Sequence, residues 1–145
     1  MIWAVLVLAT SFSAGVHAGS GDPEPIEKLY ARTCGSCHGP EGTGIPGTYP
    51  SLLASRSVSS DSAGTLVRIV LHGLQGPLVN DGMYYESVMP AFKGLSDQEI
   101  ADLVTYVRAS FGQAAGIDSS YVARVREATS SRLYPWDTAE LMLYE

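Results

Sequence analysis

The most informative stretch of the chain is Cys34-Gly35-Ser36-Cys37-His38. Two thiols separated by two residues lie on one helical turn, where each can add to one vinyl group of a haem. The imidazole of the following residue can then bind the haem iron as its proximal ligand. The spacing therefore predicts one covalently attached haem c, held by Cys34, Cys37 and His38.

Two other kinds of site use a cysteine pair at this spacing, namely a redox-active dithiol and half of a zinc site. The chain has only two cysteines, so no further thiols can complete a cysteine-based zinc cluster. Export to an oxidising compartment, predicted below, would turn a bare pair into a disulfide. The motif also ends a predicted helix and opens a glycine-rich loop, which favours haem attachment over both alternatives.

A redox haem needs a second axial ligand, and we expect it to be Met89. This residue lies between a predicted hairpin and the last predicted core helix, and Pro90 stiffens the loop behind it. A methionine packed in the core is the alternative interpretation. The other candidates are Met83 in the hairpin turn, Met142 in the last segment, and His72 at a helix end, where a histidine often only caps the helix.

The first 18 residues form an apolar run that ends in Val16-His17-Ala18, a pattern typical of signal-peptide cleavage. We expect cleavage after Ala18, which would leave a periplasmic protein that begins near Gly19. The run is short for a membrane span and has no Lys or Arg in front of it, so an uncleaved anchor is the alternative. The predicted organisation is a signal peptide at 1–18, a haem domain at 19–111 and a C-terminal extension at 112–145.

Helix and turn signals surround the motif. Asp22-Pro23 predicts a helix start, so that the first helix would run from about Pro23 into Cys34. Residues 35–60 are rich in Gly, Pro, Ser and Thr, and we expect them to wrap a ligand rather than to form a linker. An apolar helix is predicted over 62–72, and a short hairpin over 77–85.

The last part of the chain carries the clearest helix signal, the capping box of Ser96 and Glu99. The helix that it opens should end at Phe111-Gly112, and Asp118 should cap a further, polar helix. The extension after Gly112 contains too many apolar residues for a disordered tail. We expect it to pack back on the domain, with docking on a partner protein as the alternative.

The composition limits the classes of partner. The 145 residues carry 15 acidic and 9 basic side chains, a net charge of -6. This charge argues against nucleic acid, because binding to phosphates depends on clustered Lys and Arg. Redox proteins with basic docking surfaces suit such a chain better, and salt should weaken their association. After removal of the signal peptide, no apolar segment is long enough to span a membrane.

Over about residues 23–111 the chain resembles the class I cytochrome c family. That resemblance implies a mainly α cytochrome c fold, in which three core helices surround one covalently bound haem, here with a short hairpin and a C-terminal extension. Within the family, the chain is similar to monohaem domains of cytochrome subunits in periplasmic quinoprotein alcohol and sugar dehydrogenases. The resemblance rests on the haem motif through Gly39, Tyr49-Pro50-Ser51-Leu52, Val88-Met89-Pro90-Ala91-Phe92 and the helix from Leu95.

The resemblance also implies roles for single residues. The carbonyl of Pro50 would accept the Nδ1 proton of His38 and make that ligand more basic, although a simple turn proline is the alternative. Arg68 would face a haem propionate, or else be an ordinary surface arginine. The first and last helices of the family cross near the haem, which suits Tyr30 and Tyr106.

These observations predict an electron-transfer protein rather than an enzyme. Ligated by His38 and Met89, the iron would pass single electrons from a periplasmic dehydrogenase or respiratory complex to an acceptor. An alternative is a cytochrome subunit bound in a quinoprotein-type dehydrogenase. A third possibility, an open-site haem enzyme or gas sensor, requires that Met89 does not bind the iron.

Overall fold

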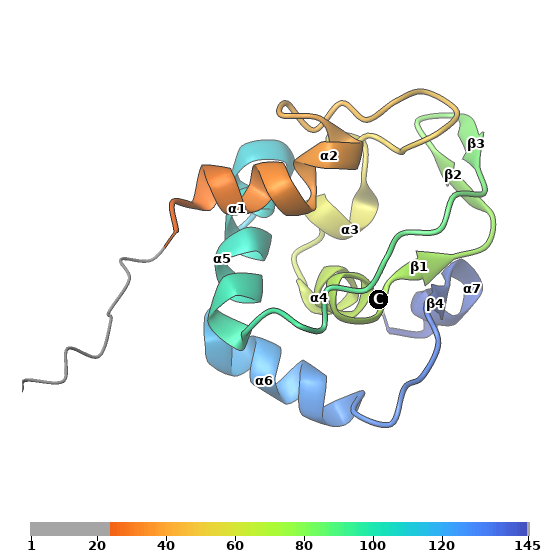
Figure 1. The fold of residues 1–145 in the computed structure, drawn as a ribbon. Coiled ribbons are helices and arrows are strands. Elements are labelled where there is room, and N and C mark those ends of the chain that lie inside the picture. Colours follow the sequence, from red (N-terminus) through yellow and green to blue (C-terminus); the bar gives the residue numbers. More distant parts are fainter. Residues whose placement is uncertain (1–23, 145) are drawn as a thin grey trace, which may run out of the picture.

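The computed structural model describes residues 24–144, so the predicted signal peptide and the helix cap at Asp22-Pro23 lie outside the described residues. The architecture is mainly helical, as the sequence predicts, with short strands at one side (Figure 1). The helices are α1 (Ile26–Thr33), α2 (Gly35–His38), α3 (Arg56–Ser59), α4 (Gly64–His72), α5 (Asp97–Val107), α6 (Ser119–Ala128) and α7 (Thr138–Leu141). The strands are β1 (Leu74–Gln75), β2 (Leu78–Asn80), β3 (Met83–Tyr85) and β4 (Trp136–Asp137).

The first helix begins later than the sequence predicts. Pro25 occupies the N-cap position with φ -53° and ψ 135°, and α1 starts only at Ile26. A proline disfavours the helical conformation of the residue before it, so the expectation of a start near Pro23 was wrong. The end of the helix is as expected, because α1 runs into Cys34 and α2 follows at once.

Helices α1 and α5 meet through aromatic side chains, as the resemblance implies. The rings of Tyr30 and Tyr106 have their centroids 5.2 Å apart, and Phe111 packs against both. The Tyr30 hydroxyl donates a hydrogen bond of 2.7 Å to the carbonyl of Gly39, just after the cysteine motif. Burial raises the pKa of Tyr30 to about 12, which keeps this phenol protonated as a donor. The contact therefore ties the start of the loop to the crossing of the two helices.

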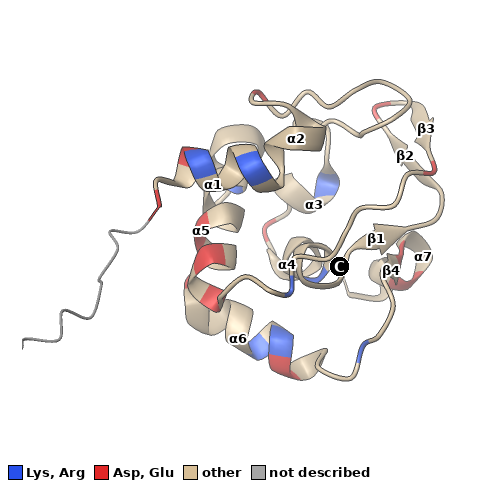
Figure 2. Ribbon diagram, in the orientation of Figure 1, with Lys and Arg blue, Asp and Glu red and all other residues tan. Residues whose placement is uncertain are grey.

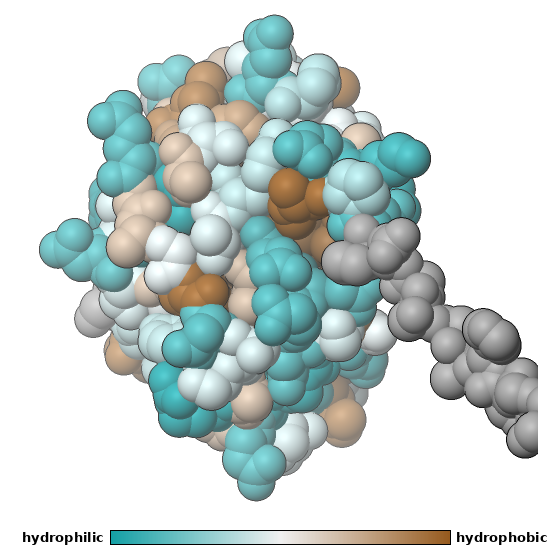
Figure 3. Space-filling model, turned by 90° about the vertical axis from the view of Figure 1, so that its left-hand side faces the viewer, coloured by the Kyte–Doolittle hydropathy of each residue, from teal (hydrophilic) through white to brown (hydrophobic). Residues whose placement is uncertain are grey.

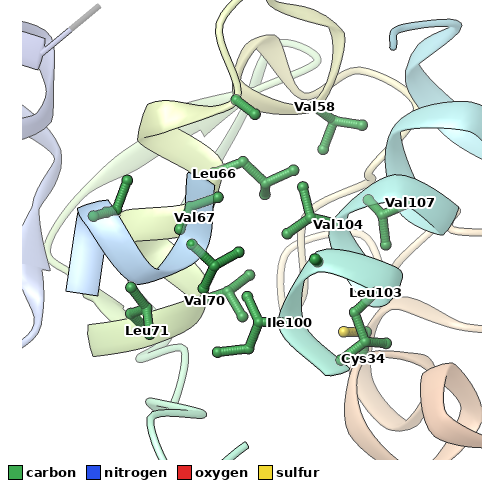
Figure 4. Packing of buried hydrophobic residues seen from close by; sticks show 14 of the residues in the cluster. Cys34, Val58, Leu66, Val67, Val70, Leu71, Ile100, Leu103, Val104 and Val107 are labelled. Atoms are coloured by element: carbon green, nitrogen blue, oxygen red, sulfur yellow. The ribbon is translucent and has the colours of Figure 1, made fainter. Parts of the chain in front are cut away.

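Helix α4 lies at the centre of the molecule. Most of its residues are buried, and Val67 and Leu71 are completely so. Figure 4 shows its side chains facing those of α5 across the core, with Cys34 at the edge of the same cluster. The helix ends at Gly73, whose φ of 82° is typical of the glycine that follows a helix. The predicted central helix is thus confirmed, although it begins two residues later than expected.

The capping box predicted for α5 is present, because Ser96 and Glu99 each accept a hydrogen bond from the other's backbone amide. A π-helical turn, Arg108–Gly112, continues the helix to the predicted end. Its Arg108 is 1% exposed and donates hydrogen bonds to carbonyls of the surrounding loops, among them that of Ala115 at 2.6 Å. This buried guanidinium, which the sequence did not indicate, joins α3 and the loop after it to the segment that follows the π-helical turn.

The hairpin is formed as predicted. Strands β2 and β3 are antiparallel, with Leu78 opposite Tyr85, and the turn residues Asp81 and Gly82 both have positive φ. Two consecutive residues of this kind match the tight turn that suits the twist of paired strands. The one-turn helix α3 and the short strands β1 and β4 have no counterpart among the predicted elements.

The residues after Gly112 pack on the rest of the structure at two places. Helix α6, capped by the Asp118 carboxylate as expected, brings Val122 and Val125 into the main core beside α4 and α5. Strand β4 then pairs with β1 in parallel, so that Trp136 lies opposite Leu74. The extension therefore contributes buried side chains to the described structure.

The surface that carries α1, α5 and α6 is mostly hydrophilic, with small apolar areas between hydrophilic side chains (Figure 3). Acidic residues gather at the first turns of α5, whereas α1 and α6 also carry basic ones (Figure 2). Within residues 24–144, no helix combines the length and the apolar composition needed to cross a membrane.

Candidate functional site

The cysteine motif lies on a single helical turn. Cys34 closes α1, and its carbonyl accepts hydrogen bonds from the amides of Cys37 and His38 at 3.2 Å and 2.9 Å. Cys34 is buried and Cys37 partly exposed, and both thiols are free. Burial raises the pKa of the Cys34 thiol, against a weaker opposite effect of the Thr33 hydroxyl. The two thiols thus lie on one helical turn.

His38 is held in one orientation. Its side chain is only 9% exposed, and Nδ1 lies 2.8 Å from the carbonyl oxygen of Pro50. Because a carbonyl can only accept, Nδ1 carries the proton and donates it. Burial lowers the pKa of His38, although the hydrogen bond to Pro50 opposes this. The neutral ring therefore keeps the lone pair of Nε2 free for a metal ion.

The loop that carries Pro50 folds tightly around His38. The amide of Gly44 donates to the His38 carbonyl at 2.8 Å, and Ile45 and Tyr49 exchange two backbone hydrogen bonds. At Gly44, φ is +69° and a Cβ atom would lie 2.6 Å from the Pro50 carbonyl oxygen. Only glycine accommodates both conditions without displacing this carbonyl. The glycine-rich loop thus positions the acceptor that orients His38.

A cavity of about 560 Å³ opens beside these residues. Its volume falls in the range of about 300 to 1,000 Å³ that is usual for cofactor and ligand sites. Its walls come from α4, α5, the hairpin, the loop after His38 and the C-terminal segment, and they are mainly apolar. Residues brought together here include Cys34, His38, Pro50, Leu66, Ile69, Val70, Met89, Leu103, Val104 and Leu141.

Met89 lies in the cavity wall, whereas each of the other candidate ligands is either strongly exposed or outside the cavity. Its backbone pairs with Leu74 through two hydrogen bonds of 2.9 Å and 3.1 Å. Met83 is in the hairpin, 41% exposed, and does not line the cavity. Met142 lines it but is 68% exposed. His72 is outside the cavity, with Nε2 at 2.8 Å from the Thr129 hydroxyl.

Arg68 is not brought to the cavity. Its guanidinium lies over the ring of Tyr144, 4.5 Å from the centroid, and the cavity side of α4 is formed by Leu66 and Ile69 with their neighbours. At 100° per residue, position 68 points away from that side of the helix. Arg68 therefore lies beside Tyr144 and outside the cavity wall, and its role toward a haem propionate stays a prediction.

Two polar residues of the cavity wall were not expected from the sequence. Asn80 is buried, and its Oδ1 has no hydrogen-bond partner within residues 24–144. A buried carbonyl oxygen without a partner is costly unless another donor satisfies it. Arg56, at the start of α3, supplies a positive charge to the same wall. In the sequence, Asn80 looks only like a turn residue and Arg56 like one basic residue in a glycine-rich loop, so neither carries a local signal.

The arrangement fits a haem c. It offers two adjacent thiols, a neutral imidazole with Nε2 free, a thioether and an apolar space that also contains an amide and a guanidinium. Across the part of the chain that the structure describes, no three His, Cys, Asp or Glu side chains gather into a group that could hold a metal ion by themselves.

Comparison with known proteins agrees with this chemistry. Residues 24–110 match the family model described as Cytochrome c. A cytochrome c-552 of Thermus thermophilus is 32% identical over 114 residues, which cover 74% of this chain and 86% of that protein. The cytochrome c subunit of a quinone alcohol dehydrogenase of Gluconacetobacter polyoxogenes is 32% identical over 68% of this chain, but only over 21% of its own length. The cytochrome subunit of a fructose dehydrogenase of Gluconobacter japonicus is 33% identical over 68% of this chain and 21% of its own length.

The family match spans more than half of the chain and includes the cysteine motif, the Pro50 loop, Met89 and α5. The C-terminal helix α6 and strand β4 lie beyond it. This chain belongs to the cytochrome c family, whose members bind haem c covalently and transfer electrons.

Proposed function

We propose that this chain is a one-electron carrier that holds its haem by thioether bonds to Cys34 and Cys37 and binds the iron through His38 and Met89. The observation that carries the proposal is that Cys34, His38 and Met89 line one apolar cavity, in which His38 is oriented by the carbonyl of Pro50. When bound, the haem supplies an iron that alternates between the ferrous and ferric states.

The residues of the chain determine how that iron behaves. The hydrogen bond from His38 to Pro50 fixes the tautomer and makes the imidazole a stronger donor. Met89, if bound to the iron, would favour the reduced state and so raise the potential. The apolar walls around α4 and α5 would limit the access of water to both ligands once the haem is bound. With His38 and Met89 both bound to the iron, the site would exchange electrons without binding a substrate.

The polar side chains of the cavity suit the carboxylates of a haem. Arg56 brings a positive charge to the cavity wall, and the NH2 group of Asn80, on the same wall, can donate to a carboxylate oxygen. Charge-assisted hydrogen bonds from such groups are the strong ones. We propose that the propionates would lie in this region of the cavity.

The ligation is tested by spectra of the holoprotein, matured in a host that attaches haem. We expect the ferric wild type to show the sulfur-to-iron band at the red edge of the spectrum. Met89→Ala should lose this band and lower the reduction potential, while Met83→Ala and Met142→Ala keep both. The two control variants remove a methionine from the hairpin and from the exposed part of the cavity wall.

Other outcomes would point elsewhere. Loss of the band in Met142→Ala instead of Met89→Ala would move the ligand to the C-terminal segment. Rapid carbon monoxide binding by the reduced wild type would indicate an open-site haem protein, and a colourless protein at the mass of its bare chain would refute haem attachment.

The carrier would work in the periplasm, after cleavage near Ala18. Mass determination of the mature protein checks this, because it should begin near Gly19. The net charge of -6 suits partners with basic docking surfaces. Electron-transfer rates with such a partner should fall as the salt concentration rises, and rates that ignore ionic strength would contradict this docking mode.

A second candidate function is a cytochrome subunit of a dehydrogenase complex that uses the same haem site. It is supported by the relatives that are named as cytochrome subunits of dehydrogenases. A carrier should be purified from its source cells free of dehydrogenase activity, whereas a subunit should remain bound to a dehydrogenase in constant ratio. Removing residues after Gly112 would not separate the two, because Val122 and Val125 belong to the core.

A further inference from the structure

The C-terminal segment of the chain lies directly beside Met89. Strand β4 pairs with β1, and α7 follows on the same side of the molecule (Figure 1). The amide of Trp136 donates to the carbonyl of Gly73 at 3.0 Å. This brings residues that are far apart in the sequence to the methionine side of the cavity.

Leu74 links Met89 to this segment. On one side its backbone exchanges two hydrogen bonds with Met89, and on the other it lies opposite Trp136 in the parallel pair. The backbone of the methionine loop is therefore one strand removed from the C-terminal segment. A displacement of β4 would be transmitted to Met89 through a single residue.

The side chains make the same connection. Trp136, Leu141 and Ile69 form a buried cluster, being 3%, 5% and 7% exposed, and Met89 packs against it together with Leu74. Leu141 also lines the main cavity. Leu141 therefore belongs both to the wall of the cavity and to the cluster against which Met89 packs.

The segment is fixed in place by hydrogen bonds of its own. The Thr138 hydroxyl donates to the carbonyl of Pro77 at 2.8 Å, which ties α7 to the start of the hairpin. Asp137 and Glu140 form a capping box around the same turn. This one-turn helix therefore has a defined position, and Leu141 is held at its end.

We propose that Leu141 is a positioning residue for the Met89 ligand and that Trp136 completes the support behind it. The proposal rests on the proposed function, since it takes Met89 as the axial ligand. Methionine has three rotatable bonds and adapts to gaps, so the side chain is held in one rotamer only when its surroundings are filled. Leu141 supplies that filling and closes the cavity on this side.

The test is the ease with which imidazole displaces the sulfur ligand from the ferric holoprotein. Leu141→Ala should raise the affinity for imidazole about tenfold, because a cavity of several methyl groups costs about 2 to 5 kcal/mol and part of this loss falls on the ligand contact. Leu143→Ala is the matched control, since Leu143 is the same residue type two positions further on but 81% exposed. It should leave the affinity unchanged.

Two further variants keep the proposal testable if Leu141→Ala folds poorly. Leu141→Met nearly preserves the side-chain volume and should have an imidazole affinity within about twofold of the wild type, since volume-conserving changes are tolerated best. Leu141→Val removes less of the side chain than Leu141→Ala and should give an intermediate increase in the affinity for imidazole. The same order should be found in the intensity of the sulfur-to-iron band.

Equal imidazole affinities in Leu141→Val, Leu143→Ala and the wild type would overturn the positioning role. This result is distinguishable from failure of the proposed function, in which the wild type itself would lack the sulfur-to-iron band and Met89→Ala would change nothing. A wild type with the band and Leu141 variants with unchanged affinity would refute only the positioning role of Leu141.

Discussion

Gly44→Ala tests whether the glycine-rich loop positions the Pro50 carbonyl for His38. At Gly44, φ is +69° and an added Cβ would lie 2.6 Å from the carbonyl oxygen of Pro50, with the Tyr49 carbonyl oxygen closer still. Both obstacles are backbone atoms, so they cannot be relieved by rotating a side chain. The Pro50 carbonyl must move, and the hydrogen bond of 2.8 Å from His38 is lost or weakened.

Gly47→Ala separates this clash from the cost of the backbone conformation. Gly47 lies in the same loop with φ +74°, and an added Cβ would meet nothing within 4 Å. Both variants incur the left-handed conformation, which costs about 1 to 2 kcal/mol, and both gain equally from a stiffer unfolded chain. Only Gly44→Ala leaves a buried hydrogen-bonding group unsatisfied, which costs about 1 to 3 kcal/mol more.

The assay is urea unfolding of the two holoproteins, together with their reduction potentials. We expect Gly44→Ala to be about 2 kcal/mol less stable than Gly47→Ala, which lowers the midpoint by about 1 M at a typical urea slope. Its potential should also rise, because a weaker hydrogen bond to Pro50 makes His38 a poorer donor to the ferric iron. Equal midpoints and equal potentials in the two variants would refute the positioning of Pro50 by this loop.

Two further predictions concern the helices. Val122→Ala in α6 should lower the free energy of unfolding by about 2 kcal/mol, because Val122 is fully buried in the core. The control is Leu133→Ala, at an 82% exposed position. An equal loss of stability in both variants would contradict the packing of α6. The pKa of Glu99 is lowered, chiefly by the hydrogen bond from the Ser96 amide. The ionised Glu99 therefore stabilises the fold above its ordinary pKa, and this stabilisation is lost as the pH falls through the lowered pKa. Between neutral and acidic pH, the urea midpoint of Glu99→Gln should therefore fall less than that of the wild type, and an equal fall in both would contradict this role of the carboxylate.

Much of the fold follows from local chemistry in the sequence. The capping box at Ser96, the turn at Asp81 and Gly82, and the cap at Asp118 were all predicted, and each depends on residues within a few positions of one another. The same is true of the cysteine motif, whose thiols and imidazole share one helical turn. Such features require no knowledge of what packs around them.

The residues that could not be predicted depend on distant parts of the chain. Arg68 lies on the side of α4 that meets Tyr144, and only the course of the C-terminal segment decides what covers that side. Strands β1 and β4 have two residues each and pair across a long separation, without any alternation to reveal them. Asn80 looks like an ordinary turn residue, because its burial in the cavity wall follows from how the hairpin packs.

The two proposed ligands are therefore held by different kinds of contact. The loop that follows His38 supplies its hydrogen-bond partner, so the motif and its loop define this half of the site by themselves. Met89 is held by Leu74 and, behind it, by Trp136 and Leu141, which lie beyond the part of the chain that matches the family. Changes in the C-terminal segment can thus alter how firmly the sulfur is held while haem attachment stays intact. The extension is then a second part of the chain, besides the Pro50 loop, through which the potential can be adjusted without a change in the haem motif.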